Sequence, residues 1–157
     1  QDLGNDQEAV ALFDKAISIW NDLFGATGTR ETDKAGLTSQ AGAFFDRAIS
    51  HRNLKHFEQA VIDYRAAANH YQVAGNQHMA GLNLYFAAGI INDELGQSES
   101  AIELYTEAIG LLDKTGDFKS ANSARLSLGL IYLYVRKSGY VTDFILCTHP
   151  ISTKGPT

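Results

Sequence analysis

The chain has 157 residues, of which 45% are hydrophobic and 20% are charged. This length and composition are typical of one globular domain with a real core, and they exclude a disordered chain. The net charge of −5 argues against nucleic acid as the main partner. No apolar run approaches the length of a membrane span, and we expect no signal peptide. Cys147 is the only cysteine, which excludes an intramolecular disulfide and favours a cytoplasmic location.

Six helices are predicted along the chain, because apolar residues recur at intervals of three and four. Turn-forming residues at 25–34 separate the first helix from the second. The helices are expected over about 7–23, 36–53, 57–74, 78–95, 98–114 and 118–136.

The helix boundaries carry signals of their own. Asn5 or Asp6 is expected to cap the first helix and Ser98 the fifth, because a short side-chain acceptor satisfies the free N–H groups of a first turn. A residue in the left-handed conformation commonly follows a helix end. We expect this conformation at Gly75, Gly96, Gly116 and Asn53.

An internal repeat with an offset of 41 residues (Ala60 to Ala101) relates two stretches of the chain. The pattern Ala-x3-aromatic-x2-Ala begins at both positions, and also at Ala9 and Ala41. These spacings place all three residues on one helix face, where the alanines let a neighbouring helix approach. A repeat of this length is typical of a solenoid. We therefore predict an all-α fold, a right-handed superhelical stack of about three antiparallel helix pairs, over residues 1–137.

The sequence changes character after the sixth predicted helix. Tyr140–Cys147 is rich in β-branched and aromatic residues, and Pro150 follows it. We interpret residues 138–157 as a divergent or truncated tail. Its apolar segment is expected to cover the last helix pair, to pair with another chain, or to aggregate.

The repeated pattern at Ala101–Ala108, followed one helix later by Leu128-Gly129-x-x-Tyr132, resembles a long variety of the tetratricopeptide (TPR) repeat. Within that superfamily, the order of features is most similar to the N-terminal part of the soluble NSF attachment proteins (SNAPs). These features are Glu8–Leu12, Leu23–Gly25, Gln40–Phe45, Ala66–Tyr71, Glu99–Leu104 and Lys114–Phe118.

The resemblance implies a non-catalytic adaptor that lies along a SNARE bundle in vesicle fusion and trafficking. It also implies recruitment of the disassembly ATPase NSF and peripheral membrane contact through the early loop. Because the C-terminal bundle that engages the ATPase in SNAPs has no counterpart here, we expect SNARE contact rather than ATPase stimulation. The alternative is a TPR-type peptide-binding adaptor unrelated to SNAREs. Its groove would be lined by the second, fourth and sixth helices, with Asn83, Asn92 and Arg125 as contacts.

Clustered cations are the candidate partner-binding residues, because lysine and arginine attract an acidic helical partner or anionic lipid. The alternative is an ordinary solvated surface with charges at helix ends. The candidates are Arg47, Arg52, Lys55 and Arg65 in one block and Lys119 and Arg125 in a second.

Three apolar residues near the first predicted corner are candidates for membrane contact. Trp20, Leu23 and Phe24 could insert at the level of the lipid headgroups, or fold back under the corner and close the core. The sequence leaves both interpretations open.

No pattern in the sequence indicates catalysis, a metal site or a cofactor. Glu99, Glu103 and Glu107 share one helix face, but with no histidine at ligand spacing we interpret them as an exposed polar face. Gly25–Arg30 lacks the Gly-Lys-Ser/Thr sequence of a phosphate-binding loop. We therefore predict a protein that binds other proteins and is not an enzyme.

Overall fold

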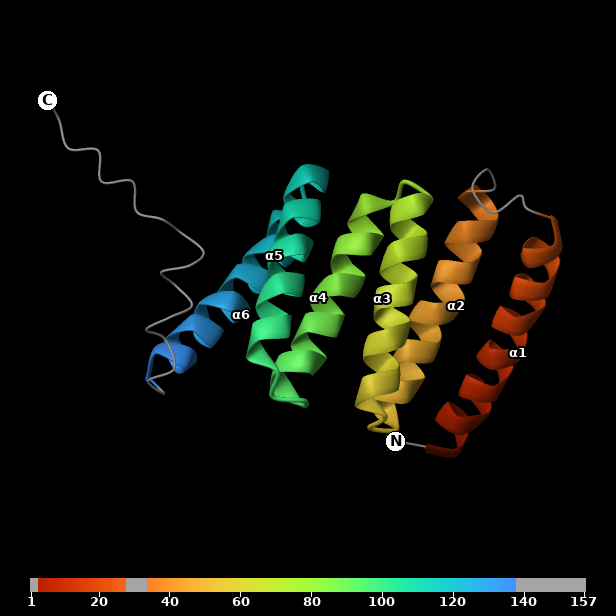
Figure 1. The fold of residues 1–157 in the computed structure, drawn as a ribbon, viewed down its shortest axis with the longest axis horizontal. Coiled ribbons are helices and arrows are strands. Elements are labelled where there is room, and N and C mark those ends of the chain that lie inside the picture. Colours follow the sequence, from red (N-terminus) through yellow and green to blue (C-terminus); the bar gives the residue numbers. More distant parts are fainter. Residues whose placement is uncertain (1–2, 28–33, 138–157) are drawn as a thin grey trace, which may run out of the picture.

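The computed structural model of the chain describes residues 3–27 and 34–137. Successive helices pack side by side in a row, with α1 at one end and α6 behind α5 at the other (Figure 1). No strand occurs among these residues, so the predicted all-α solenoid of three helix pairs is confirmed; the predicted tail lies outside the described residues. The helices are α1 (Leu3–Thr27), α2 (Lys34–Asn53), α3 (Phe57–Val73), α4 (Gln77–Asp93), α5 (Ser98–Thr115) and α6 (Phe118–Lys137).

The first helix is the one whose bounds differ most from the prediction. It continues through Gly25 to Thr27, where the sequence predicted a loop. A single glycine weakens a helix by about 1 kcal/mol without ending it. Within α1, Ile17 is the only buried side chain that the structure describes, and the predicted packing residues Phe13 and Ala16 are half-buried. As the end helix of the row, α1 has α2 as its main packing partner among the described elements.

Two of the predicted caps are wrong. Because α1 begins at Leu3, Asp6 lies inside its first turns, where its carboxylate accepts a hydrogen bond from the Asn53 side chain at 3.2 Å. Gln97, with no side-chain cap bond, precedes α5. Ser98 is the first helical residue and its hydroxyl donates to the Asn92 side chain.

Three of the four residues predicted to be left-handed have a positive φ, and the fourth is replaced by another residue of the same turn. The three glycines at helix ends have φ values of 85°, 67° and 78°. In the α2–α3 turn the residue with positive φ is Lys55, at 61°, rather than Asn53. The amides of Lys55 and His56 donate to the carbonyls of Arg52 and His51, which closes the end of α2. Lys55 stands one repeat before Gly96, so the turn geometry is conserved between the repeats although the residue is not glycine.

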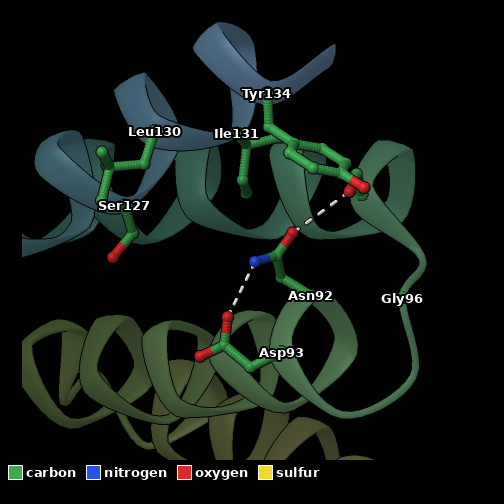
Figure 2. A pocket seen from close by; sticks show the side chains of 8 residues that line it. Asn92, Asp93, Gly96, Ser127, Leu130, Ile131 and Tyr134 are labelled. Carbon is green, nitrogen blue, oxygen red and sulfur yellow. Dashed lines mark hydrogen bonds between the residues drawn. The ribbon is translucent and has the colours of Figure 1, made fainter. Parts of the chain in front are cut away.

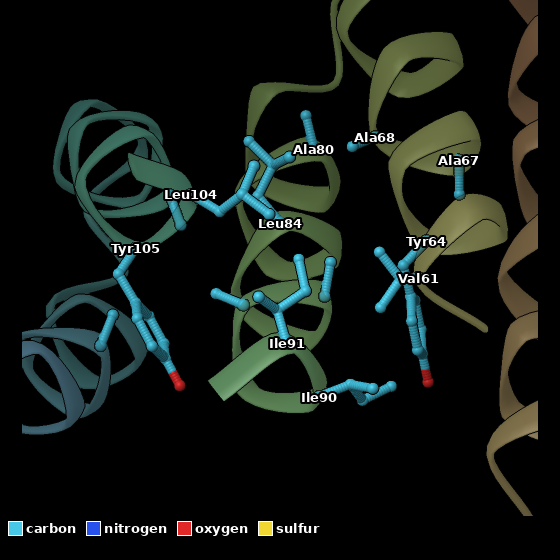
Figure 3. Packing of buried hydrophobic residues seen from close by; sticks show 14 of the residues in the cluster. Val61, Tyr64, Ala67, Ala68, Ala80, Leu84, Ile90, Ile91, Leu104 and Tyr105 are labelled. Atoms are coloured by element: carbon cyan, nitrogen blue, oxygen red, sulfur yellow. The ribbon is translucent and has the colours of Figure 1, made fainter. Parts of the chain in front are cut away.

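The core consists of alanine seams between helices, filled on either side by larger residues (Figure 3). Ala60 and Ala67 on α3, and Ala101 and Ala108 on α5, are fully inaccessible to solvent, as the repeat predicted. Tyr64, between the α3 alanines, is also fully buried. The small side chains let the helix axes approach, and the rings fill the space beside them.

A ladder of aromatic rings runs through the stack from α2 to α5. Phe45 lies 5.9 Å from Tyr64, measured between ring centroids, and Tyr64 lies 5.7 Å from Phe86. Phe86 adjoins Tyr85, which in turn lies 5.9 Å from Tyr105. The ladder joins neighbouring helix pairs, so the repeats share one core.

Gly81 marks the closest approach of α4 to α5. A Cβ atom at this position would lie 2.9 Å from Leu112 Cγ and 3.1 Å from Leu111 Cβ. Both atoms are near the stems of their side chains, and they cannot move without shifting α5. A Cβ atom on Gly110, which lies on α5, would instead meet open space.

We predict opposite effects for alanine at these two glycines. Gly81→Ala should lower the free energy of unfolding by about 1–3 kcal/mol, because the methyl group overpacks the α4–α5 seam. Gly110→Ala should raise it by about 0.5–1 kcal/mol, through helix propensity alone. Urea denaturation followed by circular dichroism measures both. A Gly81→Ala protein as stable as the parent would contradict the close approach.

Asp117 connects the start of α6 to α4. One carboxylate oxygen accepts the backbone N–H of Ser120 at 3.1 Å and caps α6. The other lies 3.0 Å from Nε2 of His78, on α4. The hydrogen bonds from Ser120 and then His78 lower the pKa of Asp117 from 3.8 to about 2.

This pKa predicts a loss of stability in acid. Between about pH 4 and pH 2 the unfolded chain takes up a proton at Asp117 before the folded chain does, so the contribution of Asp117 to stability disappears as the pH falls. Asn at this position keeps the cap but cannot titrate. The difference in Tm between the parent and Asp117→Asn should therefore shrink from pH 6 to pH 2. A constant difference would contradict this assignment.

Candidate protein-interaction site

Two adjoining cavities form a groove on the face shared by α2, α4 and α6. The first, of about 310 Å³, reaches from Arg52 on α2 across α4 to Ser127 on α6. The second, of about 570 Å³, lies between the C-terminal end of α4 and α6 (Figure 2). Asp93 and Ser127 line both cavities, so the groove is continuous.

The lining of the groove mixes apolar side chains with polar and charged ones along its length. Asn92 donates to the Asp93 carboxylate at 2.8 Å and accepts from Ser98 at 3.2 Å, so its amide is oriented by its neighbours (Figure 2). Burial raises the pKa of Tyr105, whose hydroxyl stays neutral and interacts with Ser127. This combination suits an extended chain or a helix that brings apolar side chains and a few hydrogen-bonding groups.

The three predicted groove contacts lie in different environments. Asn92 lines the groove. Asn83 is fully buried, and its amide donates to the Met79 carbonyl within α4 at 2.8 Å, so its prediction as a surface contact is wrong. The prediction rested on the hydrogen-bonding chemistry of its amide, but Asn83 falls on the core side of α4. Arg125 is exposed and forms an ion pair with Asp113 on α5.

Arg47 serves inside the protein as a brace between three helices. Its guanidinium forms two hydrogen bonds to the carboxylate of Asp63 on α3, at 2.8 Å and 2.5 Å. It forms a third to Asp14 on α1, at 2.5 Å, and lies over the ring of Phe44. The Arg47 side chain is 17% exposed and that of Asp63 is 3% exposed. Its guanidinium is therefore already engaged, which leaves it poorly placed as a surface contact.

His51 completes this buried cluster. Its Nε2 atom lies 3.8 Å from Asp63, and its Nδ1 atom is buried with no hydrogen-bond partner. Burial lowers the pKa of His51, in spite of the nearby carboxylate. The cluster is a structural polar core that joins α1, α2 and α3.

The sequence contained a signal for this cluster. Asp63 falls between Ala60 and Ala67 on the alanine face of α3, which is where a carboxylate needs a buried partner. A cation on the facing side of α2 was the natural candidate. Arg47 was instead grouped with the surface cations because it is close to them in sequence.

The other members of the first cationic block are on the surface. Arg52, Lys55 and Arg65 are exposed, and none of the ion pairs among the described residues involves them. Arg52 lines the groove, Lys55 lies in the α2–α3 turn, and Arg65 lies on the outer side of α3. Lys119, of the second block, is exposed at the start of α6.

The candidate membrane residues are all within α1. Trp20 is half-buried, and the side chains of Leu23 and Phe24 lie outside the description. Their membrane contact stays a prediction. None of the described helices combines the length and the apolar character needed to cross a membrane.

The described residues offer no set of three side chains that could hold a metal ion. Glu99, Glu103 and Glu107 are exposed on α5, as the polar-face interpretation expects.

One family model matches the chain. It describes the soluble NSF attachment proteins (SNAP) and matches residues 22–140, which is more than half of the sequence. No curated protein and no solved structure matches. The matched region runs from the end of α1 to the end of α6, so it contains the whole groove and the exposed cations. The chain belongs to the soluble NSF attachment protein family.

Proposed function

We propose that the protein is a non-catalytic adaptor that binds SNARE complexes in vesicle fusion and trafficking. Family membership carries this proposal. The exposed cations support it, because none of the ion pairs between described residues involves Arg52, Lys55 or Arg65, and these side chains can attract an acidic helical partner. The proposed partner is a protein in the cytoplasm rather than a small molecule.

The proposed contact residues differ from the residues that hold them in place. Arg47 orients the end of α2, which carries Arg52, by its bonds to Asp14 and Asp63. Removing it would leave the buried Asp63 carboxylate uncompensated, at a cost of about 3–5 kcal/mol. A test of the surface must therefore leave Arg47 intact.

A second candidate function is capture of a peptide in the groove, unrelated to SNAREs. The continuous groove over α2, α4 and α6 favours it. Asp93 is exposed, lies at the junction of the two cavities, and can be changed without affecting the core.

We predict that Arg52→Glu/Lys55→Glu/Arg65→Glu weakens binding to an assembled SNARE complex by about ten- to a hundredfold at low salt. The loss should shrink at high salt, because exposed charges are screened. Lys114→Glu, an exposed reversal on α5, is the matched control and should bind as the parent does. Fluorescence anisotropy with a labelled SNARE bundle gives the dissociation constants.

Binding of the triple variant that equals the parent at both salt concentrations would remove this patch from the site. Loss of binding in Asp93→Lys, with the triple variant unaffected, would favour the groove. A parent that binds no SNARE complex at all would reject the adaptor proposal.

We also propose peripheral membrane contact through Trp20, Leu23 and Phe24 on α1. Leu23→Ser/Phe24→Ser should reduce flotation with phosphatidylcholine and phosphatidylserine vesicles severalfold, because apolar side chains supply the insertion energy. Equal flotation of variant and parent would assign these residues to the core instead.

A further inference from the structure

The last helix of the described region carries an apolar stripe that faces solvent. Leu126, Leu130 and Leu133 are each at least 59% exposed, and Tyr134 beside them is 71% exposed. Their spacing of four and three residues places the leucines on one side of α6. Leu130 and Tyr134 also line the groove. A row of exposed apolar residues on one helix face marks an interaction surface.

The repeat identifies the kind of partner that this side of α6 fits. One repeat of 41 residues separates Tyr85 from Leu126 and Gly89 from Leu130. The two leucines therefore occupy the positions on α6 that Tyr85 and Gly89 occupy on α4. On α4 this is where α5 docks: Tyr105 lies 5.9 Å from Tyr85, between ring centroids, and its hydroxyl lies 3.6 Å from where a Cβ on Gly89 would be. The equivalent face of α6 is therefore suited to a docked helix.

The charge of α6 restricts the choice of helix. It carries Lys119, Arg125, Arg136 and Lys137 and no acidic residue. Only Arg125 forms an ion pair within the described residues whose side chains are placed. A helix that docks on this stripe is favoured if it is acidic and carries its own exposed apolar residues.

The chain itself contains such a helix, at the other end of the row. On the face of Leu12 and Ile19, α1 carries Glu8 and Asp22 against one cation, Lys15, whereas Asp6 and Asp14 are bonded to α2. Leu12 and Ile19, seven residues apart, are 62% and 52% exposed on the side that faces away from α2. In Figure 1, α1 and α6 lie at opposite ends, so one copy cannot bring them together.

We propose that copies of this chain associate head to tail, with α6 of one copy docked on α1 of the next. In an antiparallel arrangement, Leu126 and Leu133 would meet Ile19 and Leu12, and Asp22 towards the end of α1 would lie opposite Ser123, one helical turn from Lys119 at the start of α6. Because the two surfaces differ, the contact does not close into a symmetric pair and can propagate as an open chain. This proposal does not depend on SNARE binding.

The contact joins two single helix faces, which is smaller than a standard interface. We therefore expect weak, reversible association, with a dissociation constant of about 10–100 μM that rises with salt. Sedimentation velocity of the full chain over a range of concentrations should show a weight-average mass above that of the monomer.

Two single substitutions test each surface separately. Leu130→Glu blocks the α6 stripe, and Ile19→Glu blocks the α1 stripe. Each variant alone should be monomeric at concentrations where the parent associates. An equimolar mixture should form a one-to-one dimer and nothing larger, because each variant still has one intact surface. Ile62→Glu, which changes an equally exposed apolar residue on α3, is the control and should associate as the parent does.

Several results would overturn the proposal. A parent that remains monomeric at all concentrations has no such contact. Association that persists in Ile19→Glu but not in Leu130→Glu would indicate a symmetric contact between two α6 helices. A monomeric parent that binds phosphatidylserine vesicles through Leu130 would assign the stripe to a membrane. Circular dichroism of each variant verifies that the helices are intact.

Discussion

The structure depends on how closely the helices can approach one another. About half of the buried core residues are alanine, and Ala60, Ala67, Ala101 and Ala108 are completely inaccessible to solvent. At Gly81 the two helices, α4 and α5, are so close that even one added methyl group would collide with α5. Such seams supply little buried area for each residue, so larger groups beside them have to fill the remaining space. The aromatic ladder from Phe45 to Tyr105 meets this requirement and joins successive pairs into one body.

For the same reason, α1 is attached less firmly than the helices inside the row. Alanine seams stabilise a helix that has neighbours on both sides, and α1 has one main neighbour among the described helices. Its attachment relies on polar contacts: Asp14 with Arg47, Asp6 with Asn53, and Asn21 with Gln40. The Asp14 side chain is 57% exposed, and ion pairs that reach the solvent contribute little to stability because water screens them. What the arrangement provides is a fixed position for α2, and hence for the exposed Arg52.

The helices and their order could be predicted from the sequence because they depend on local spacing. Helix ends at Gly75, Gly96 and Gly116 followed from backbone chemistry that only glycine satisfies at low cost. Side-chain exposure could not be predicted as well, because it is decided by the neighbouring helix. Arg47 and Asn83 were expected at the surface, yet α1 and α3 cover the first and the core side of α4 encloses the second. Lys55 shows the converse: the surrounding turn imposes a left-handed backbone that its own preference does not.

The distribution of charge along the row explains how one small solenoid can carry two separable surfaces. α5 is acidic and lies directly beside the basic α6, yet among the side chains that the structure places only Asp113 forms an ion pair across, to Arg125. Glu99, Glu103 and Glu107 point outward, so they do not neutralise Lys119. The cations at the α2–α3 turn are distant in sequence from those of α6 and lie on different helix pairs. Because screening acts on each group of charges locally, substitutions at one surface leave the attraction at the other intact. The proposed partner binding at Arg52 and the proposed contact between copies can be altered independently at Leu126, whereas Leu130 also lines the groove that begins at Arg52.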